Sequence, residues 1–250
     1  MDAKDLSIII PAYKEEKRIG ATLEELAAFL KRADLGRVEV IVAVTRGGDD
    51  TAEVARQRQS NFADLKVFES NVHRGKGHAV AEGMAKATGR YKMFMDADLA
   101  TPLHHLETVA RQIQAGNDVI IGVRDLAKIH KGLPRKLIST FGNILVRVVL
   151  GLKLKDTQCG FKAFRAAVAD DLFSVQKIEG WGFDMELLSV AKRRGYSLAT
   201  VDIPDWRDVA GGSLGVGIKA SLMTFAELFK IKWYLITGKY DRKPGGQAQT

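Results

Sequence analysis

Two aspartates separated by one residue, Asp96 and Asp98, directly follow a short apolar run at residues 91–95. Carboxylates at positions i and i+2 of a strand point the same way, and a turn after the strand can direct both outward. Two such oxygen ligands suit Mg²⁺ or Mn²⁺, and an ion held there can bridge a diphosphate and neutralise its charge. The alternative is an acidic pair that complements the dipole of a helix opened by Thr101 and Pro102.

A second cluster, Arg74-Gly75-Lys76-Gly77-His78, precedes that apolar run. Its glycines permit close approach of the backbone, and the start of the helix that follows offers free N–H groups. Lys76 adds positive charge. The combination predicts a contact to a phosphate or a sugar, while a solvated glycine-containing turn is the alternative.

The second half of the chain carries two further polar segments, at residues 156–162 and 180–186. Asp184 is a candidate base or acceptor-site carboxylate, and Trp181 offers an aromatic face to a sugar. The alternatives are an acid in the first turn of a helix and a core aromatic side chain. We interpret Cys159 as a small buried packing residue, because no histidine that could activate its thiol lies near it in the sequence.

The elements that must position these residues alternate between strand and helix. Apolar and β-branched runs predict strands at residues 6–10, 38–44, 65–68, 91–95 and 118–122. Helical periodicity predicts helices at residues 15–32, 50–59, 77–88 and 102–115. This alternation predicts crossover connections and a largely parallel sheet, whose ligands sit beyond the carboxyl ends of the strands. The candidate motifs fall at those ends.

The remainder of the chain is less regular. Periodicity predicts helices at residues 134–150, 183–194 and 216–237 and a strand at 197–203. We therefore expect one domain at residues 1–212, an amphipathic helix at 213–240 and a disordered tail at 241–250.

Composition limits the classes of partner. The 250 residues are 46% hydrophobic and 27% charged, with a formal net charge of +8 and a single cysteine, which excludes an internal disulfide. The positive charge favours nucleotide phosphates or acidic lipid headgroups. Nucleic acid is not expected as a partner, because no stacking aromatics interleave the basic residues. Neither a signal peptide nor a transmembrane helix is expected.

Taken in order, these segments resemble family 2 glycosyltransferases of the GT-A fold, and in particular the polyprenyl-phosphate glycosyltransferases. Among those, the likeness is to dolichyl-phosphate β-glucosyltransferases first and to dolichyl-phosphate mannose synthases next. It extends over residues 6–207 and is carried by segments 8–16, 75–77, 96–102, 158–165 and 180–188. The resemblance implies an α/β fold with a Rossmann-like, mostly parallel sheet flanked by helices.

The same resemblance implies roles for individual residues. Those implied in nucleotide-sugar binding are Pro11, Ala12, Tyr13, Glu15, Lys76, Asp96 and Ala97. Asp96 and Asp98 are implied as the metal ligands. Arg124 and Arg135 are implied to face the acceptor phosphate, since guanidinium groups bind phosphate bidentately. Those expected at the reacting groups are Asp98, Asp156, Asp184 and Arg124.

Two positions depart from the family pattern. After the second strand, relatives usually read Asp-Asp-Gly-Ser, with an acid that contacts the base, whereas residues 44–47 here read Val-Thr-Arg-Gly. Either Asp49 or Asp50 substitutes from a shifted turn, or the donor is held differently. Ala100 stands where mannose synthases often carry a glutamine that joins the metal, which favours the glucosyltransferase-like branch.

We therefore expect a metal-dependent, inverting transfer of a hexose, glucose from UDP-glucose, to a polyprenyl phosphate. A phosphate acceptor is already ionised, so positioning and charge neutralisation would supply most of the rate. The alternatives are GDP-mannose as donor, a soluble or glycan acceptor, or a non-catalytic relative that only binds nucleotide sugars.

A lipid acceptor calls for an apolar, basic approach face. A basic run at residues 128–136 precedes an apolar helix, and the helix at residues 216–237 combines apolar side chains, Trp233 and several lysines. This pattern is typical of a helix that lies in a membrane interface, although both helices could instead pack against the sheet. We expect a peripheral protein on the cytoplasmic face of a membrane.

Overall fold

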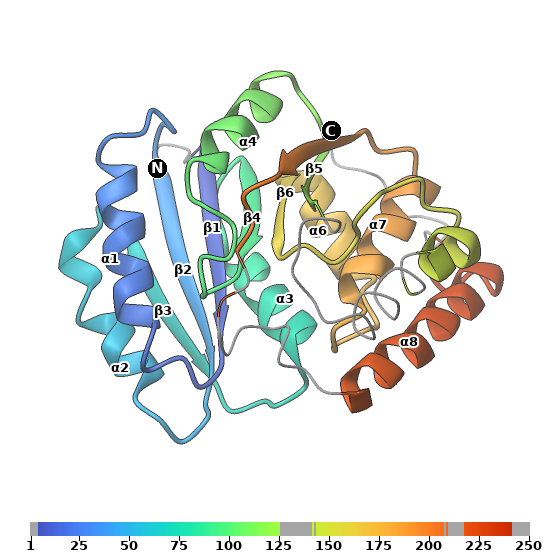
Figure 1. Cartoon of the computed structure of the whole chain (residues 1–250), viewed down its shortest axis with the longest axis horizontal. Coiled ribbons are helices and arrows are strands. Elements are labelled where there is room, and N and C mark those ends of the chain that lie inside the picture. The colour runs from blue at the N-terminus through green and yellow to red at the C-terminus, as the bar shows by residue number, and fades with distance from the viewer. Residues whose placement is uncertain (1–4, 126–141, 143, 208, 210–217, 242–250) are drawn as a thin grey trace.

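The computed structural model describes residues 5–125, 142, 144–207, 209 and 218–241. Its centre is a sheet of seven strands in the order β3-β2-β1-β4-β6-β5-β7 (Figure 1). The strands are β1 Leu6–Ala12, β2 Val38–Thr45, β3 Leu65–Ser70, β4 Tyr91–Met95, β5 Val119–Arg124, β6 Phe161–Arg165 and β7 Leu198–Ile203. All neighbours pair in parallel except β6, which runs antiparallel to both β4 and β5. The expected largely parallel α/β sheet is confirmed.

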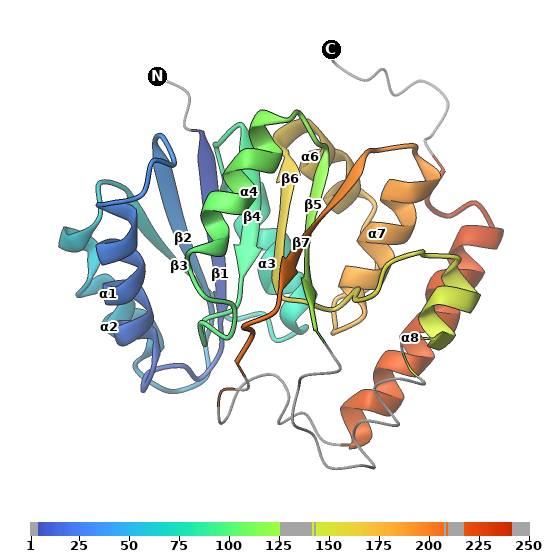
Figure 2. The same cartoon turned by 45° about the horizontal axis from the view of Figure 1, so that its top comes forward.

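Helices cover both faces of this sheet (Figures 1 and 2). They are α1 Ile19–Leu30, α2 Thr51–Arg56, α3 Lys76–Lys86, α4 His105–Gln114, α6 Ala166–Ser174, α7 Phe183–Arg193 and α8 Ile218–Ile236. Residues 142 and 144–150 are also helical. Because helices bury both faces, the central strands β1 and β2 are buried along nearly their whole length and are mostly apolar, whereas the edge strands β3 and β7 carry exposed polar residues.

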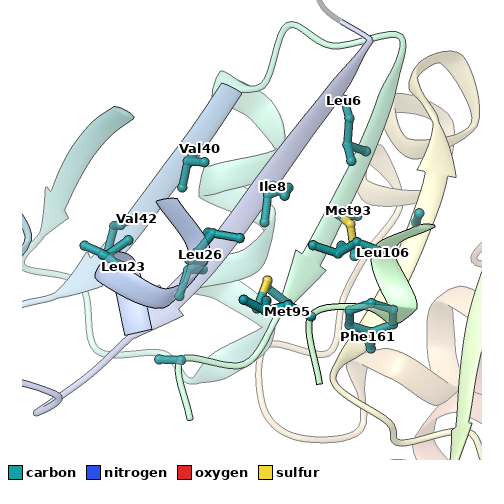
Figure 3. Packing of buried hydrophobic residues seen from close by; sticks show 14 of the residues in the cluster. Leu6, Ile8, Leu23, Leu26, Val40, Val42, Met93, Met95, Leu106 and Phe161 are labelled. Carbon is teal, nitrogen blue, oxygen red and sulfur yellow. The ribbon is translucent and has the colours of Figure 1, made fainter. Parts of the chain in front are cut away.

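Two hydrophobic clusters lie on opposite sides of the sheet. Ile8 and Val40 point into a cluster closed by α1, α2 and α4, which Figure 3 shows from close by. Ile9 and Ile41 point the other way, into a cluster closed by α3, α6, α7 and α8. Alternate residues of one strand thus reach different cores. Both cores hold the carboxyl ends of β1, β2 and β4 in place.

The differences between the structure and the prediction include two elements that were not predicted and two whose bounds change. Strand β6 and helix α6 were not predicted, because Lys162 and Arg165 place two charged residues among the five of β6. Helix α1 begins at Ile19 and not at residue 15, since the preceding loop contains Lys14 with a φ of 57°. Helix α2 ends at Arg56, earlier than predicted, and a 3₁₀ turn at Gln59–Asn61 follows it.

Several expectations fall outside the described residues. They are the first part of the helix at 134–150, the boundary at residues 212 and 213, nearly all of the tail at 241–250, and Arg135. Within the described part of the chain, we find no helix that combines the length and the apolar character needed to cross a bilayer.

Candidate active site

The aspartate pair lies where β4 ends, at the carboxyl edge that β4 shares with β1. The backbone N–H of Asp96 donates to the carbonyl of Gly160 (3.1 Å), and the Asp98 carboxylate accepts from the N–H of Ala100 (3.0 Å). Leu99 has a φ of 51°, and with Lys14 it is one of the two non-glycine residues of the described chain at positive φ. Such strained backbone clusters at functional sites, and here it marks the two loops that carry the candidate motifs.

Lys76, at the start of α3, is the cation of the site. Its ammonium forms an ion pair with Asp96 and lies 5.3 Å from the centroid of the Trp181 ring. Burial alone would lower the pKa of Lys76, but the nearby carboxylates of Asp96 and Asp184 more than offset this and raise it. The lysine therefore stays charged at neutral pH.

The glycines around Lys76 are required by packing. Gly75 has a φ of 113°, and a Cβ there would stand 2.7 Å from the carbonyl oxygen of Glu179. A Cβ on Gly77 would stand 2.7 Å from the Cβ of Phe183. Only glycine at these positions lets the start of α3 lie against the segment that carries Trp181.

Like charges converge on the aspartate pair. Burial raises the pKa of Asp98, and the neighbouring charge of Asp96 raises it further. Burial also raises the pKa of Glu15, where Arg18 opposes the shift and Asp98 and Asp96 add to it. Hard carboxylate oxygens that repel one another in a half-buried site fit a divalent cation such as Mg²⁺ or Mn²⁺, which would relieve the repulsion.

An exposed aromatic side chain follows the end of β1. Tyr13 follows Pro11 and Ala12 at the end of β1, and its side chain is 49% exposed. Its ring meets the His73 ring edge-on, with 5.5 Å between centroids. A Cβ on Gly47 would stand 3.3 Å from Tyr13, so the loops after β1 and β2 are in close contact. Tyr13 offers a ring face on which a nucleobase could stack.

The loop after β2 contains the acid that the motif at residues 44–47 lacks. One oxygen of Asp49, Oδ2, accepts from the Thr51 hydroxyl (2.6 Å) and from the N–H of Glu16 (3.4 Å). The other oxygen, Oδ1, is buried and has no hydrogen-bond partner among the described residues. A buried, unpaired carboxylate oxygen is costly, so Asp49 is the better placed of the two aspartates to accept a hydrogen bond from a ligand.

Arg124 and Asp156 form a buried, two-pronged ion pair. Arg124 donates from Nε to Oδ2 (2.6 Å) and from Nη2 to Oδ1 (3.0 Å) of Asp156, and its guanidinium lies 5.4 Å from the Trp206 ring. Asp156 also accepts from the N–H of Gln158. Burial opposes ionisation of Asp156, but the charge of Arg124 keeps its pKa below the usual range. Asp156 is thus an ionised residue that orients Arg124.

Asp184 lies in the first turn of α7 and pairs with Lys162 of β6. The ammonium of Lys162 donates to Asp184 (2.7 Å) and to the carbonyl of Cys159 (2.6 Å). Burial raises the pKa of Asp184 despite the opposing charges of Lys162 and Lys76. Burial also raises the pKa of the Cys159 thiol to about 12, which confirms Cys159 as a packing residue.

Comparison with known proteins identifies the class of this site. The family described as Glycosyl transferase family 2 matches residues 7–173. The chain belongs to glycosyl transferase family 2. This family 2 enzyme is similar to a dolichyl-phosphate beta-glucosyltransferase of Drosophila melanogaster, with 33% identity over 84% of this chain and 69% of the relative. Dolichyl-phosphate beta-glucosyltransferase ALG5D of Trichomonas vaginalis is 30% identical over 95% of this chain and 77% of its own.

Solved structures show the same fold in other glycosyltransferases. Glucosyl-3-phosphoglycerate synthase from Mycobacterium tuberculosis, crystallised with Mn²⁺, uridine diphosphate and glucosyl-3-phosphoglycerate, superposes with a TM-score of 0.68 at 22% identity. The match covers 92% of this chain and 80% of that one. The family 2 enzyme described here therefore has the GT-A fold.

The structure brings most of the expected residues of this glycosyltransferase to one edge of the sheet. Asp96, Asp98 and Lys76 lie together, and electrostatic coupling to Lys76 places Asp184 near them. Arg135 lies outside the described residues. Sequence reasoning missed three contributors: His73 beside Tyr13, Trp206 beside Arg124, and Glu227 of α8.

Glu227 contacts the loop that carries Trp181. Its carboxylate accepts from the N–H of Gly182 (2.7 Å), and a Cβ on either Gly180 or Gly182 would collide with its side chain. A lone acid on a helix that is otherwise apolar and basic was the one sequence signal that could have found it.

Proposed function

We propose that this glycosyltransferase moves glucose from UDP-glucose to a polyprenyl phosphate with inversion at the anomeric carbon, and that it depends on a divalent cation held by Asp96 and Asp98. The observation that carries the proposal is the half-buried carboxylate pair at the end of β4, with Lys76 beside it. The relatives named dolichyl-phosphate beta-glucosyltransferase, which match over most of both chains, support the choice of donor and acceptor.

Donor binding would use the loops after β1 and β2. The Tyr13 ring stacks on the base, and the free oxygen of Asp49 accepts from a base N–H group, which uracil provides. Pro11, Ala12 and Glu15 form the wall of this pocket, and the backbone of Ala97 follows the pyrophosphate. A divalent cation on Asp96 and Asp98 would neutralise charge on the departing diphosphate. Lys76 holds Asp96 in place and adds a fixed positive charge.

Acceptor binding would use the arginines. Asp156 occupies Nε and one hydrogen of Nη2 on Arg124, which leaves Nη1 to bind a phosphate oxygen. Arg135 would supply a second guanidinium. An oxygen of the acceptor phosphate attacks C1 of the sugar as the bond from C1 to the UDP oxygen breaks, and UDP leaves with the electron pair. The attacking phosphate carries no proton that must be removed, so no base is needed. Asp184 instead orients the neighbouring lysines, Lys162 and Lys76.

The lipid part of the acceptor calls for contact with a membrane surface, and α8 offers one. Phe229, Trp233 and Ile236 follow a spacing of four and three residues along α8 and are more than half exposed. Exposed Lys230 and Lys232 flank them. Apolar side chains and lysines on one helix face suit an anionic bilayer surface.

A second exposed apolar pair adjoins this stripe. Ile144 and Val148 are 52% and 75% exposed on the helical segment 144–150. A Cβ on Gly142 would stand 3.6 Å from Phe225 of α8, so the two helices are neighbours, as both views show (Figures 1 and 2). We assign these two helices to the cytoplasmic face of a membrane.

The decisive experiment measures radiolabelled glucose transfer from UDP-glucose to polyprenyl phosphate in vesicles, with Mn²⁺ or Mg²⁺. Asp98→Asn should lower turnover by about 10²-fold or more, because it removes a ligand charge opposite the diphosphate. Asp202→Asn changes an exposed carboxylate on β7 and should leave turnover unchanged. Full activity of Asp98→Asn, or wild-type activity that persists in excess chelator, would refute the assignment.

A soluble phosphate acceptor is the second candidate, because an enzyme of the same fold was crystallised with phosphoglyceric acid. Transfer that proceeds equally well without lipid would favour it. A parallel screen with GDP-mannose tests the base-binding loop, since Asp49 replaces the usual acid. Tight nucleotide binding with no turnover for any donor would identify a binding protein.

A further inference from the structure

A second cluster of metal-ligating side chains lies outside the aspartate pair, where the turn after β7 meets the start of α4. Nε2 of His105 lies 2.6 Å from Oδ1 of Asp205, and Nε2 of His104 lies 3.3 Å from Oδ2. The two imidazole rings are 4.2 Å apart between centroids. One ligand atom from each of the three residues lies within 4.8 Å of the others.

The donor set differs in kind from that of the aspartate pair. Two imidazole nitrogens and one carboxylate oxygen suit Zn²⁺, Co²⁺ or Ni²⁺, whereas carboxylates alone suit Mg²⁺ or Mn²⁺. Zinc binds such ligands at about 2.0–2.2 Å in a tetrahedral arrangement. Ligand atoms in that arrangement stand roughly 3.5 Å apart, so the present spacing needs only small rotations of the exposed His104 ring and of Asp205.

We propose that His104, His105 and Asp205 form a second cation site, selective for Zn²⁺-like ions and independent of the aspartate pair. His105 is 9% exposed in its side chain and fixed by its hydrogen bond, so it is a preorganised ligand. The side chains of His104 and Asp205 are 60% and 42% exposed, which leaves a fourth position open to water. Cation binding at this site is independent of the donor and the acceptor proposed above.

Hydrogen bonds through Arg207 and Ala100 connect this site to Asp98. The N–H of Arg207, two residues after Asp205, donates to the carbonyl of Ala100 (2.9 Å), and Asp98 accepts from the N–H of Ala100. Trp206 between them stacks beside Arg124. An ion that ties Asp205 to α4 would therefore stiffen the loop that carries Asp98.

A groove of about 720 Å³ gives an ion access to this corner. Asp98, His104 and Arg207 line it together with residues of α1. The two candidate cation sites thus open onto the same solvent-filled space, and a soft ion could enter without passing through the donor pocket.

The test is a titration of the metal-stripped full chain with Co²⁺, whose visible absorption reports nitrogen ligands, followed by competition with Zn²⁺. We expect one saturable Co²⁺ site that Zn²⁺ displaces. His104→Gln should weaken Co²⁺ binding by about 10²-fold, because one of three protein ligands is lost. Asp98→Asn should leave the Co²⁺ absorption unchanged, and so should His73→Gln, which controls for binding to any exposed histidine.

Thermal unfolding provides the second readout. Zn²⁺ should raise the Tm of the wild-type protein and of Asp98→Asn, because a ligand that binds only the folded chain stabilises it. The rise should be clearly smaller for His104→Gln, in which the aspartate pair alone remains to bind the ion. His104 is largely exposed, so this variant should fold normally without metal. Co²⁺ binding that survives His104→Gln, or that Asp98→Asn abolishes, would overturn the proposal, as would the absence of any saturable binding.

Discussion

Gly160 tests whether the position of Asp96 matters for turnover. It lies just before β6, and its φ is not positive, so alanine is compatible with its backbone. A Cβ there would stand 2.5 Å from Oδ1 of Asp96 and closer still to Oδ2 of the same residue. Ordinary contact begins at 3.4 Å, so Gly160→Ala must move Oδ1, the oxygen that pairs with Lys76, by about 0.9 Å or displace the new methyl group by as much.

A displacement of about 1 Å in a reacting centre can cost about 10²-fold in rate, which corresponds to about 2.7 kcal/mol in the activation barrier. The assay is kcat/KM for glucose transfer from UDP-glucose with saturating Mn²⁺. Gly142→Ala is the matched control, because its Cβ would meet Phe225 at an ordinary 3.6 Å. Gly160→Ala with activity within about threefold of wild type, and unchanged circular dichroism, would refute the geometric argument.

Three further predictions concern other parts of the molecule. Arg124→Lys should lower kcat by about 10-fold or more without unfolding the chain, because an ammonium group cannot bind both Asp156 oxygens and a phosphate. Steady-state kinetics will check this, with Lys86→Arg as the control. The pKa of Glu39 is lowered to about 2 by hydrogen bonds from Lys66, Thr88 and Ser7, which outweigh the effect of burial. The folded pKa of Glu39 is below its unfolded value, so ionised Glu39 stabilises the fold by roughly 3 kcal/mol above about pH 4.5, and this is lost as the pH falls towards 2. The free energy of unfolding in urea, measured at pH 6 and pH 3, should depend less on pH for Glu39→Gln than for wild type. Replacing Phe229 and Trp233 together with serine should abolish sedimentation with anionic vesicles while nucleotide binding stays intact, and unchanged sedimentation would exclude α8 as the contact.

The sequence predicted those parts of the fold and site that depend on local pattern. Strand β4 was located correctly because the apolar residues Met93, Phe94 and Met95 directly precede the aspartate pair. The i and i+2 spacing then placed both carboxylates at a strand end. Strand β6 was missed because two of its five residues, Lys162 and Arg165, are charged, and Lys162 is buried through an ion pair with Asp184, 22 residues away.

Local sequence patterns could not predict side-chain contacts between residues that lie far apart in the chain. Nothing near Arg124 in the sequence indicates that Asp156, 32 positions later, will occupy two of its nitrogens. The missing acid after β2 was noticed as a departure, but only the folded loop shows that Asp49 has an unpaired oxygen. Side-chain roles that depend on a distant partner require the tertiary structure.

Helix α8 has an exposed apolar side and also contacts the loop that carries Trp181, which bears on how turnover could depend on lipid. Its outer side exposes Phe229 and Trp233, while Glu227 on the same helix holds the N–H of Gly182 next to Trp181. Trp181 in turn lies against Lys76, the partner of Asp96. If the outer side binds a bilayer, as proposed, rotation of the helix would pull on the peptide beside Trp181, and the bilayer would then act mechanically on the reaction centre as well as deliver the acceptor.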